Sequence, residues 1–197
     1  MRKEDTQIVR ISKRGFTLIE LLVVIAILAV LATAVVLVLN PAELIRQGRD
    51  STRLNDMTNI QAALALYLSD ANPATASLGA CSATLAKCTY AATASGFTTR
   101  TGCTVSTDTT IAGSGWVDVD IGSVSGGSPL SRFPVDPVND ATAFYAYACD
   151  NTNKWYELNA RMESVKYSSG GGGDAESKDG GDSPTIFEVG NDPGLNL

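Results

Sequence analysis

The strongest pattern in the chain is an apolar run from Phe16 to Leu39, broken by a single acidic residue, Glu20. The run is 24 residues long, and as a helix it would extend about 36 Å, enough to cross a hydrocarbon core of about 30 Å. A helix that is apolar on all sides must lie in lipid or against similar helices. Because a carboxylate inside a span costs about 2.5 to 3.5 kcal/mol, and less near a helix end, we expect Glu20 to have a partner.

A second helix is predicted after the apolar run, at residues 42–69. Its larger apolar side chains recur at three- and four-residue spacing, which is typical of an amphipathic helix: Met57, Ile60, Leu64, Tyr67 and Leu68. The charged side chains are expected largely on the other faces: Arg46, Arg49, Asp50, Arg53 and Asp56. Pro41 lacks an amide donor and crowds the preceding turn, so the helix should bend or restart near residue 40.

The remaining sequence predicts a small domain of loops and strands. Residues 70–115 are rich in Ala, Ser, Thr and Gly and are expected to form loops with short elements. Residues 115–121 predict a strand, with an apolar face made by Val117, Val119 and Ile121. Asp118 and Asp120 then lie on the opposite face, which we interpret as a solvated strand face and not as a catalytic pair.

Two further strands, residues 144–149 and 155–162, are separated by a short polar turn and predict a hairpin. Its core-facing side chains are expected to be Tyr156, Leu158, Ala160 and Met162. Thr185–Val189 predicts a final strand. The fold class is therefore α+β, with a long N-terminal helix, half apolar and half amphipathic, packed on a small antiparallel sheet.

Charge is distributed unevenly along the chain, whose formal net charge is −6. Residues 1–15 hold five basic and two acidic side chains, a net of +3, which leaves −9 for the remainder. The positive-inside rule then keeps the N-terminus cytoplasmic and sends the acidic part across the membrane. This acidic part has no basic patch for nucleic acid. An uncleaved signal anchor remains an alternative.

The residues just before and within the apolar run resemble the cleavage and methylation signature of type IV prepilins and type II secretion pseudopilins. The resemblance lies in Lys13-Arg14, Gly15-Phe16-Thr17 and Glu20. It implies that a membrane peptidase cuts after Gly15 and methylates the new amine of Phe16. It also implies that Glu20 pairs with the amine of a neighbouring subunit. Residues 1–15 would then be a leader, 16–39 a transmembrane and filament-core helix, and 40–197 the amphipathic helix plus the globular pilin head.

The C-terminal part is similar to the sheet motif of major pseudopilins in FPVDPVND at residues 133–140 and YELNARMES at residues 156–164. The resemblance implies a structural subunit of a pilus-like filament, with a major pseudopilin of a secretion system as the alternative. It implies as partners further copies of the chain, a prepilin peptidase, an assembly ATPase and a membrane platform. A membrane-anchored binding module that never polymerises is a second alternative. No phosphate loop or nucleophile–base pair indicates an enzyme, and the chain has no histidine.

The head contains candidate residues for disulfide bonds. Four cysteines lie beyond the apolar run, where an oxidising compartment would permit disulfides, and their spacing does not fit zinc. Three pairings are possible, and free cysteines are the alternative; we favour Cys81 with Cys88 and Cys103 with Cys149.

Residues 168–184 read as a glycine-rich flexible loop, but a similar loop in major pseudopilins binds calcium. The resemblance implies Asp174, Asp179 and Asp182 as ligands, since calcium prefers hard oxygen donors.

Overall fold

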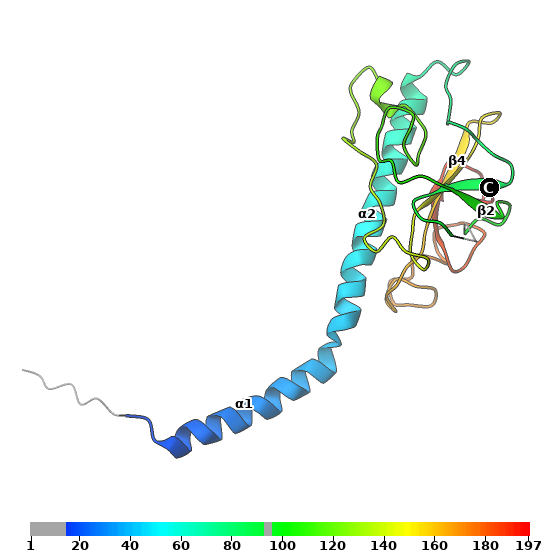
Figure 1. Ribbon diagram of the computed structural model, residues 1–197. Coiled ribbons are helices and arrows are strands. Elements are labelled where there is room, and N and C mark those ends of the chain that lie inside the picture. The colour runs from blue at the N-terminus through cyan, green and yellow to red at the C-terminus, as the bar shows by residue number, and fades with distance from the viewer. Residues whose placement is uncertain (1–14, 93–95) are drawn as a thin grey trace, which may run out of the picture. The chain divides into compact units, whose positions relative to one another are not determined.

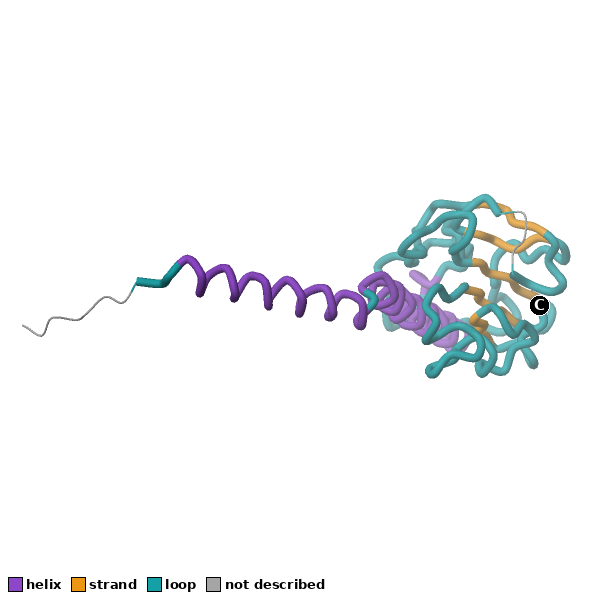
Figure 2. Tube along the Cα trace, turned by 90° about the horizontal axis from the view of Figure 1, so that it is seen from below, coloured by secondary structure: helices purple, strands orange, loops and turns teal. Residues whose placement is uncertain are grey.

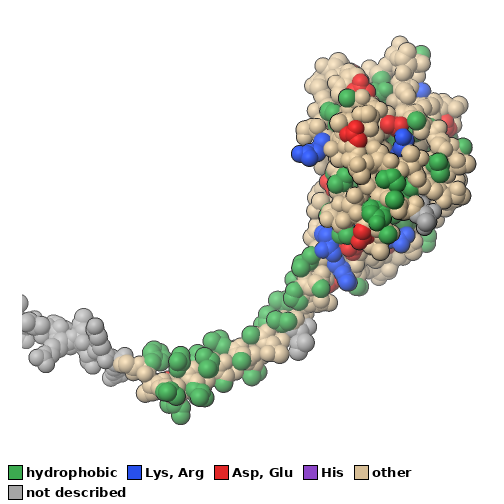
Figure 3. Space-filling view, in the orientation of Figure 1, with side chains coloured by type: hydrophobic (Ala, Val, Ile, Leu, Met, Phe, Trp, Pro, Cys, Tyr) green, Lys and Arg blue, Asp and Glu red, His purple; other side chains and the backbone are tan. Residues whose placement is uncertain are grey.

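The computed structural model describes residues 15–92 and 96–197 and divides into two compact units, one ending at Pro41 and the other running from Ala42 to Leu197. The first unit is the helix α1, Leu18–Leu39. Every α1 residue whose exposure is described is exposed, and Figure 3 shows hydrophobic side chains along the helix. Over Leu18–Val36 the helix is long and apolar enough to cross a membrane. The apolar run therefore forms the expected helix.

The chain changes helix at Asn40. This residue closes α1 in a left-handed conformation with φ 41° and ψ 75°, and α2, Pro41–Asp70, begins at the next residue. Proline is tolerated in the first turn of a helix, where its missing N–H would have no partner, and it disfavours helical geometry in the residue before it. The break expected near residue 40 is confirmed.

One stripe of α2 is buried: Asp50, Arg53, Met57, Ile60, Ala63, Leu64 and Tyr67. From Met57 onward this is the predicted apolar face, and it packs on Tyr147, Tyr156 and Leu158 of the sheet. Asp50 and Arg53 continue the same stripe, so the expectation that they occupy other faces is wrong. Their burial is possible because each finds charged or backbone partners in the loops packed beside the helix.

The sheet has five strands in the order β2-β1-β3-β4-β5 (Figures 1 and 2). Their bounds are Leu85–Cys88 for β1, Gly102–Val105 for β2, Ala146–Asp150 for β3, Trp155–Ala160 for β4 and Phe187–Gly190 for β5. β3 and β4 form the predicted hairpin, and β5 is the final strand. All four predicted core residues of the hairpin are buried.

The sheet is mixed and not wholly antiparallel, because β1 and β2 run parallel. Residues 89–101 connect these two strands, and a connection of about a dozen residues is what a parallel pair needs. The short elements expected within residues 70–115 are therefore two strands whose relative direction the sequence pattern did not reveal.

Residues 115–121 do not form the predicted strand. The alternation of burial is present, since Val117, Val119 and Ile121 are buried while Asp120 is exposed. The segment has one isolated bridge, between Asp120 and Ala112, and then a short 3-10 turn at Ile121–Ser123. Apolar side chains at every second position thus indicate an extended chain with one buried face, and such a chain does not need a neighbouring strand.

The disulfides join Cys81 to Cys149 and Cys88 to Cys103, so the favoured pairing is wrong. Cys88 ends β1, and the parallel pairing of β1 with β2 places Cys103 beside that strand, opposite Ala86, within the reach of a disulfide. In the structure the bonded Cα atoms are 5.1 Å apart for Cys81 and Cys149 and 5.5 Å apart for Cys88 and Cys103.

Candidate processing and assembly site

The start of α1 is a capping box. Thr17 has an extended conformation and is the N-cap, and its hydroxyl accepts a 3.3 Å bond from the backbone N–H of Glu20. In return the Glu20 carboxylate accepts bonds of 2.8 Å from the Thr17 N–H and 2.7 Å from the Thr17 hydroxyl. The first turn of a helix has backbone N–H groups without partners, and this arrangement satisfies two of them.

Glu20 therefore has a partner within the chain, as its position required. Both of the bonds that it accepts end on Oε2, which leaves Oε1 without a bond among the described residues. An ionised carboxylate offers about four acceptor sites. Glu20 can thus cap its own helix and still accept bonds from a donor outside the chain.

Gly15 and Phe16 are open to the surroundings. Phe16 is 86% exposed, and a Cβ placed on Gly15 would meet no atom within 4 Å. Gly15 also lacks the positive φ that favours glycine. No contact in the described part of the chain therefore calls for a glycine at this position. The rest of the predicted leader, residues 1–14, lies outside the described residues.

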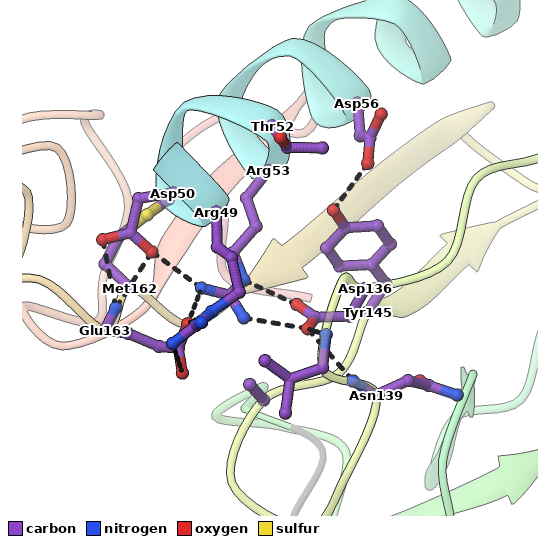
Figure 4. Close-up of polar contacts among 12 residues, drawn as sticks. Arg49, Asp50, Thr52, Arg53, Asp56, Asp136, Asn139, Tyr145, Met162 and Glu163 are labelled. Atoms are coloured by element: carbon purple, nitrogen blue, oxygen red, sulfur yellow. Dashed lines mark hydrogen bonds and ion pairs between the residues drawn. The ribbon is translucent and has the colours of Figure 1, made fainter. Parts of the chain in front are cut away.

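A second polar site lies near the start of the buried stripe of α2, where Arg53 is completely buried (Figure 4). Its Nε and Nη2 donate to Asp136 at 2.6 and 2.8 Å, and its Nη1 donates to Asp50 at 2.7 Å and to Glu163 at 2.8 Å. Burial opposes the charge on Arg53, but these bonds outweigh it and raise the pKa of the guanidinium. The group is therefore charged at any physiological pH.

The carboxylates around Arg53 also hold the backbone of two loops. Asp50 accepts from the N–H groups of Glu163 and Ser164, and Asp136 accepts from those of Val138 and Asn139. Arg53 therefore links α2 to the loop after β4 and to the loop before β3. We call Arg53, Asp50, Asp136 and Glu163 the arginine cluster.

Arg49 adds a second basic group to the arginine cluster. Its Nε donates to Glu163 at 2.6 Å. Burial works against the Glu163 charge, but the bonds from Arg49 and Arg53 prevail and lower the pKa of this carboxyl. Nearby, the Tyr145 hydroxyl donates to Asp56 at 2.8 Å. The loop before β3 and the loop after β4 are thus held to the first half of α2 by charged and polar groups.

The structure does not bring the three candidate calcium ligands together as a metal site. Asp174 accepts from Gly170 and Ser177, and these bonds lower its pKa to about 2. Asp179 accepts from the N–H groups of Gly181 and Glu188, and Asp182 accepts from the hydroxyl of Thr98. Across residues 15–92 and 96–197, no group of three or more acidic, histidine or cysteine side chains is arranged to hold a metal. Asp174 and Asp179 instead accept bonds from the backbone of the glycine-rich loop, and Asp182 joins that loop to Thr98.

Two buried acids lie beside that loop, Glu157 and Glu188, and no sequence pattern indicated them. Burial, with the nearby Asp182 and Asp192 adding repulsion, raises the pKa of Glu157 to about 7. Burial, together with repulsion from Glu157, Asp182 and Asp179, raises the pKa of Glu188 to about 8. Both side chains are 1% exposed.

Other residues missed from the sequence had readable signals. Thr17 was missed, although it and Glu20 fit the Thr-x-x-Glu spacing of a capping box at the start of the apolar run. Arg53 precedes Met57 by four residues and Asp50 precedes Arg53 by three, so both continue the stripe of Met57. The partners Asp136 and Glu163 had no such signal, because only the tertiary fold brings them to α2.

Comparison with known proteins gives one finding that bears on this site. Residues 10–36 match a protein-family model described as the prokaryotic N-terminal methylation motif. This motif is the signature of type IV pilin and pseudopilin precursors, and the chain carries it at the position that the sequence resemblance indicated. No curated protein and no solved structure is significantly similar to the chain.

Proposed function

We propose that this chain is the structural subunit of a type IV pilus-like filament, made as a membrane precursor and matured by a prepilin peptidase. The observation that carries the proposal is the N-terminal methylation motif, which coincides with an apolar helix exposed along its described length. Such a helix needs an apolar environment. The membrane provides it before assembly, and the helices of neighbouring subunits provide it in the filament.

Processing after Gly15 fits the geometry at the start of α1. Nothing in the described chain contacts a side chain at this position, so the preference for glycine would come from the peptidase that reads it. Cleavage would place the new amine on Phe16, which is exposed, and the same enzyme would methylate it. The basic leader would stay in the cytoplasm and the acidic head would lie outside it.

Glu20 is the proposed assembly contact. Its Oε2 caps α1, and its Oε1 is available to the amine of a neighbouring Phe16. Opposite charges attract strongly in a medium of low dielectric constant, and pairing removes the cost of leaving either charge alone there. The contact would therefore form as a subunit leaves the lipid and joins other helices.

The chain itself would do no chemistry in this process. A peptidase, an assembly ATPase and a membrane platform would supply the work, and the head, held to α2 by the arginine cluster, would form the outer surface of the filament. The major pseudopilin of a type II secretion system is the second candidate function. It is favoured by the pseudopilin-like segment at residues 133–140, whose Asp136 joins the arginine cluster.

The experiment that tests processing is to express the full chain with a prepilin peptidase and measure the N-terminal mass. We expect a methylated chain that begins at Phe16. Gly15→Val should block cleavage, whereas Gly48→Val, an exposed glycine of α2, should not. A wild-type chain that keeps its leader would contradict the proposal and favour the anchored module. Long surface fibres would favour the pilus, and a secretion defect without such fibres would favour the pseudopilus.

A further inference from the structure

The three most exposed large apolar side chains in the described part of the unit Ala42–Leu197 are Leu44, Ile45 and Val165. Leu44 and Ile45, near the start of α2, are 53% and 61% exposed, and Val165, in the loop after β4, is 74% exposed. The other large apolar side chains on the described surface of this unit are all less exposed. Apolar groups that gather at one place on a surface indicate a site of interaction, whereas scattered ones do not.

Contacts on both sides of Val165 hold its loop against α2. The backbone N–H groups of the two residues before it donate to Asp50, at 3.0 and 2.8 Å. Tyr167, two residues after it, brings its hydroxyl to 3.5 Å from the hydroxyl of Ser51. Ser51 follows Leu44 by seven residues, or about two helical turns, so the two lie on the same face of α2. Val165 therefore lies along the face of α2 that presents Leu44.

Charge is sorted at this surface. Within residues 43–53 and 161–167, the exposed charged side chains are all basic: Arg46, Arg161 and Lys166. The acidic side chains of these segments are buried or half-buried: Glu43, Asp50 and Glu163. Arg46 makes no hydrogen bond or ion pair with a described residue, and the Lys166 ammonium lies over the Tyr167 ring, 4.7 Å from its centre. The exposed charge here is therefore positive, although residues 16–197 carry a net charge of −9.

The chain itself places the start of α2 close to the end of α1. Only Asn40 separates Leu39, the last residue of α1, from the first residue of α2. Leu44 and Ile45 therefore lie within about 15 Å of Leu39, by chain length alone. If α1 spans the membrane, as the proposed function requires, both side chains lie in or just outside the layer of lipid head groups.

We propose that an apolar–basic patch, formed by Leu44, Ile45, Val165, Arg46 and Lys166, rests on the surface of a membrane that contains anionic phospholipid. The proposal rests on the proposed function, since it needs α1 to be the membrane anchor. The three apolar side chains enter the boundary between the head groups and the acyl chains, while the two basic groups reach the phosphates. A second copy fits less well, because the same patch on a copy would bring like charges together. The contact holds the head against the membrane until the subunit leaves for the filament.

The test uses tryptophan fluorescence of the full chain in vesicles whose lipids carry bromine near the carbonyl end of the acyl chain, where it quenches an indole at the membrane surface. The vesicles contain equal parts of phosphatidylglycerol and phosphatidylcholine, or phosphatidylcholine alone, and flotation shows first whether the chain is anchored. The probe is Val165→Trp, and the emission of Trp116 and Trp155, measured on the wild type, is subtracted. Ala74→Trp is the matched control, because Ala74 is exposed beyond the other end of α2.

We expect strong quenching of Val165→Trp in the anionic vesicles, less in the neutral ones, and little for Ala74→Trp in either. Each basic group near an anionic surface strengthens the contact about fivefold, so Arg46→Gln with Lys166→Gln should remove most of the quenching in the anionic vesicles. Ile45→Trp, on α2, is the second probe, with the same expected result, should Val165→Trp not fold.

A chain that does not float would contradict the membrane anchor of the proposed function, and this contact with it. A chain that floats while Val165→Trp is quenched no more than the control overturns the contact alone, as does equal quenching in the two kinds of vesicle. A blue-shifted emission that bromine does not quench would assign the patch to a second copy and also overturn the proposal.

Discussion

Arg53 and Asp136 meet through two parallel hydrogen bonds, 2.6 Å from Nε and 2.8 Å from Nη2, although 83 residues separate them in the chain. Both side chains are fully buried. Removing one partner of such a pair leaves an uncompensated charge in the interior, whereas the intact pair contributes less than its geometry suggests. The arginine cluster is therefore a place where single substitutions should be costly.

We expect Arg53→Met to reduce the free energy of unfolding of the head by about 3 to 5 kcal/mol, because Asp136 and Asp50 would keep buried charges without a cation. Urea unfolding of the full chain, followed by the fluorescence of the buried Trp116, measures the change. Arg46→Met is the matched control, since Arg46 lies exposed on the same helix. Equal midpoints for the two variants would show that the cluster is not a structural link.

The two buried acids predict that the stability of the head depends on pH. The folded pKa values of about 7 for Glu157 and about 8 for Glu188 lie above those of an unfolded chain. The folded state therefore binds more protons between about pH 4.5 and pH 8, so the free energy of unfolding should fall as pH rises through this window. Urea midpoints at pH 5 and pH 8 check the sign.

Glu188→Gln should flatten this pH dependence, because the amide does not ionise and can still accept the bond that Ser183 donates to the carboxylate. Asp120→Asn, on an exposed side chain, is the matched control and should keep the wild-type slope. A Glu188→Gln slope as steep as that of the control would contradict the account.

Tryptic digestion without reduction, followed by mass spectrometry, determines the disulfide connectivity. Cleavage after Arg53, Lys87, Arg100, Arg132 and Lys154 places each cysteine on its own tryptic peptide. Without reduction, we expect the peptide 54–87 linked to 133–154, and 88–100 linked to 101–132. A link between 54–87 and 88–100 would restore the pairing expected from the sequence.

The two disulfides should differ in their effect on stability. The Cys81–Cys149 bond closes a segment with a sequence separation of 68, against 15 for Cys88–Cys103. On the chain-entropy account, their removal costs about 4 and about 3 kcal/mol respectively. Urea unfolding of the Cys81→Ser/Cys149→Ser and Cys88→Ser/Cys103→Ser variants compares them. A larger loss from the second variant would show that native packing, and not loop entropy, dominates.

The sequence predicted those parts of the fold that depend on local pattern. The apolar run, the break at Pro41, the apolar stripe from Met57 and the β3–β4 hairpin are all confirmed, because each is set by periodicity or by backbone geometry. The prepilin signature could also be read, since it is contiguous and the family comparison finds it at residues 10–36.

What the sequence could not give depends on contacts between distant segments. The parallel pairing of β1 with β2 and the bond between Cys81 and Cys149 follow from how the chain crosses the sheet. The burial of Arg53 follows from carboxylates supplied by two loops. The strand expected at residues 115–121 failed for a similar reason: its buried face was correctly identified, but among the described residues it makes only one isolated bridge and joins no sheet.

The central claim is that Glu20 is an assembly contact as well as a helix cap, and electron microscopy of filaments made by Glu20→Leu and Thr17→Ala tests it most directly. Thr17→Ala removes the cap at a cost of about 1 kcal/mol but leaves the Glu20 carboxylate in place, so we predict filaments like those of the wild type. Glu20→Leu should still insert and be cut to begin at Phe16, yet form no filaments. Normal filaments from Glu20→Leu would contradict the account.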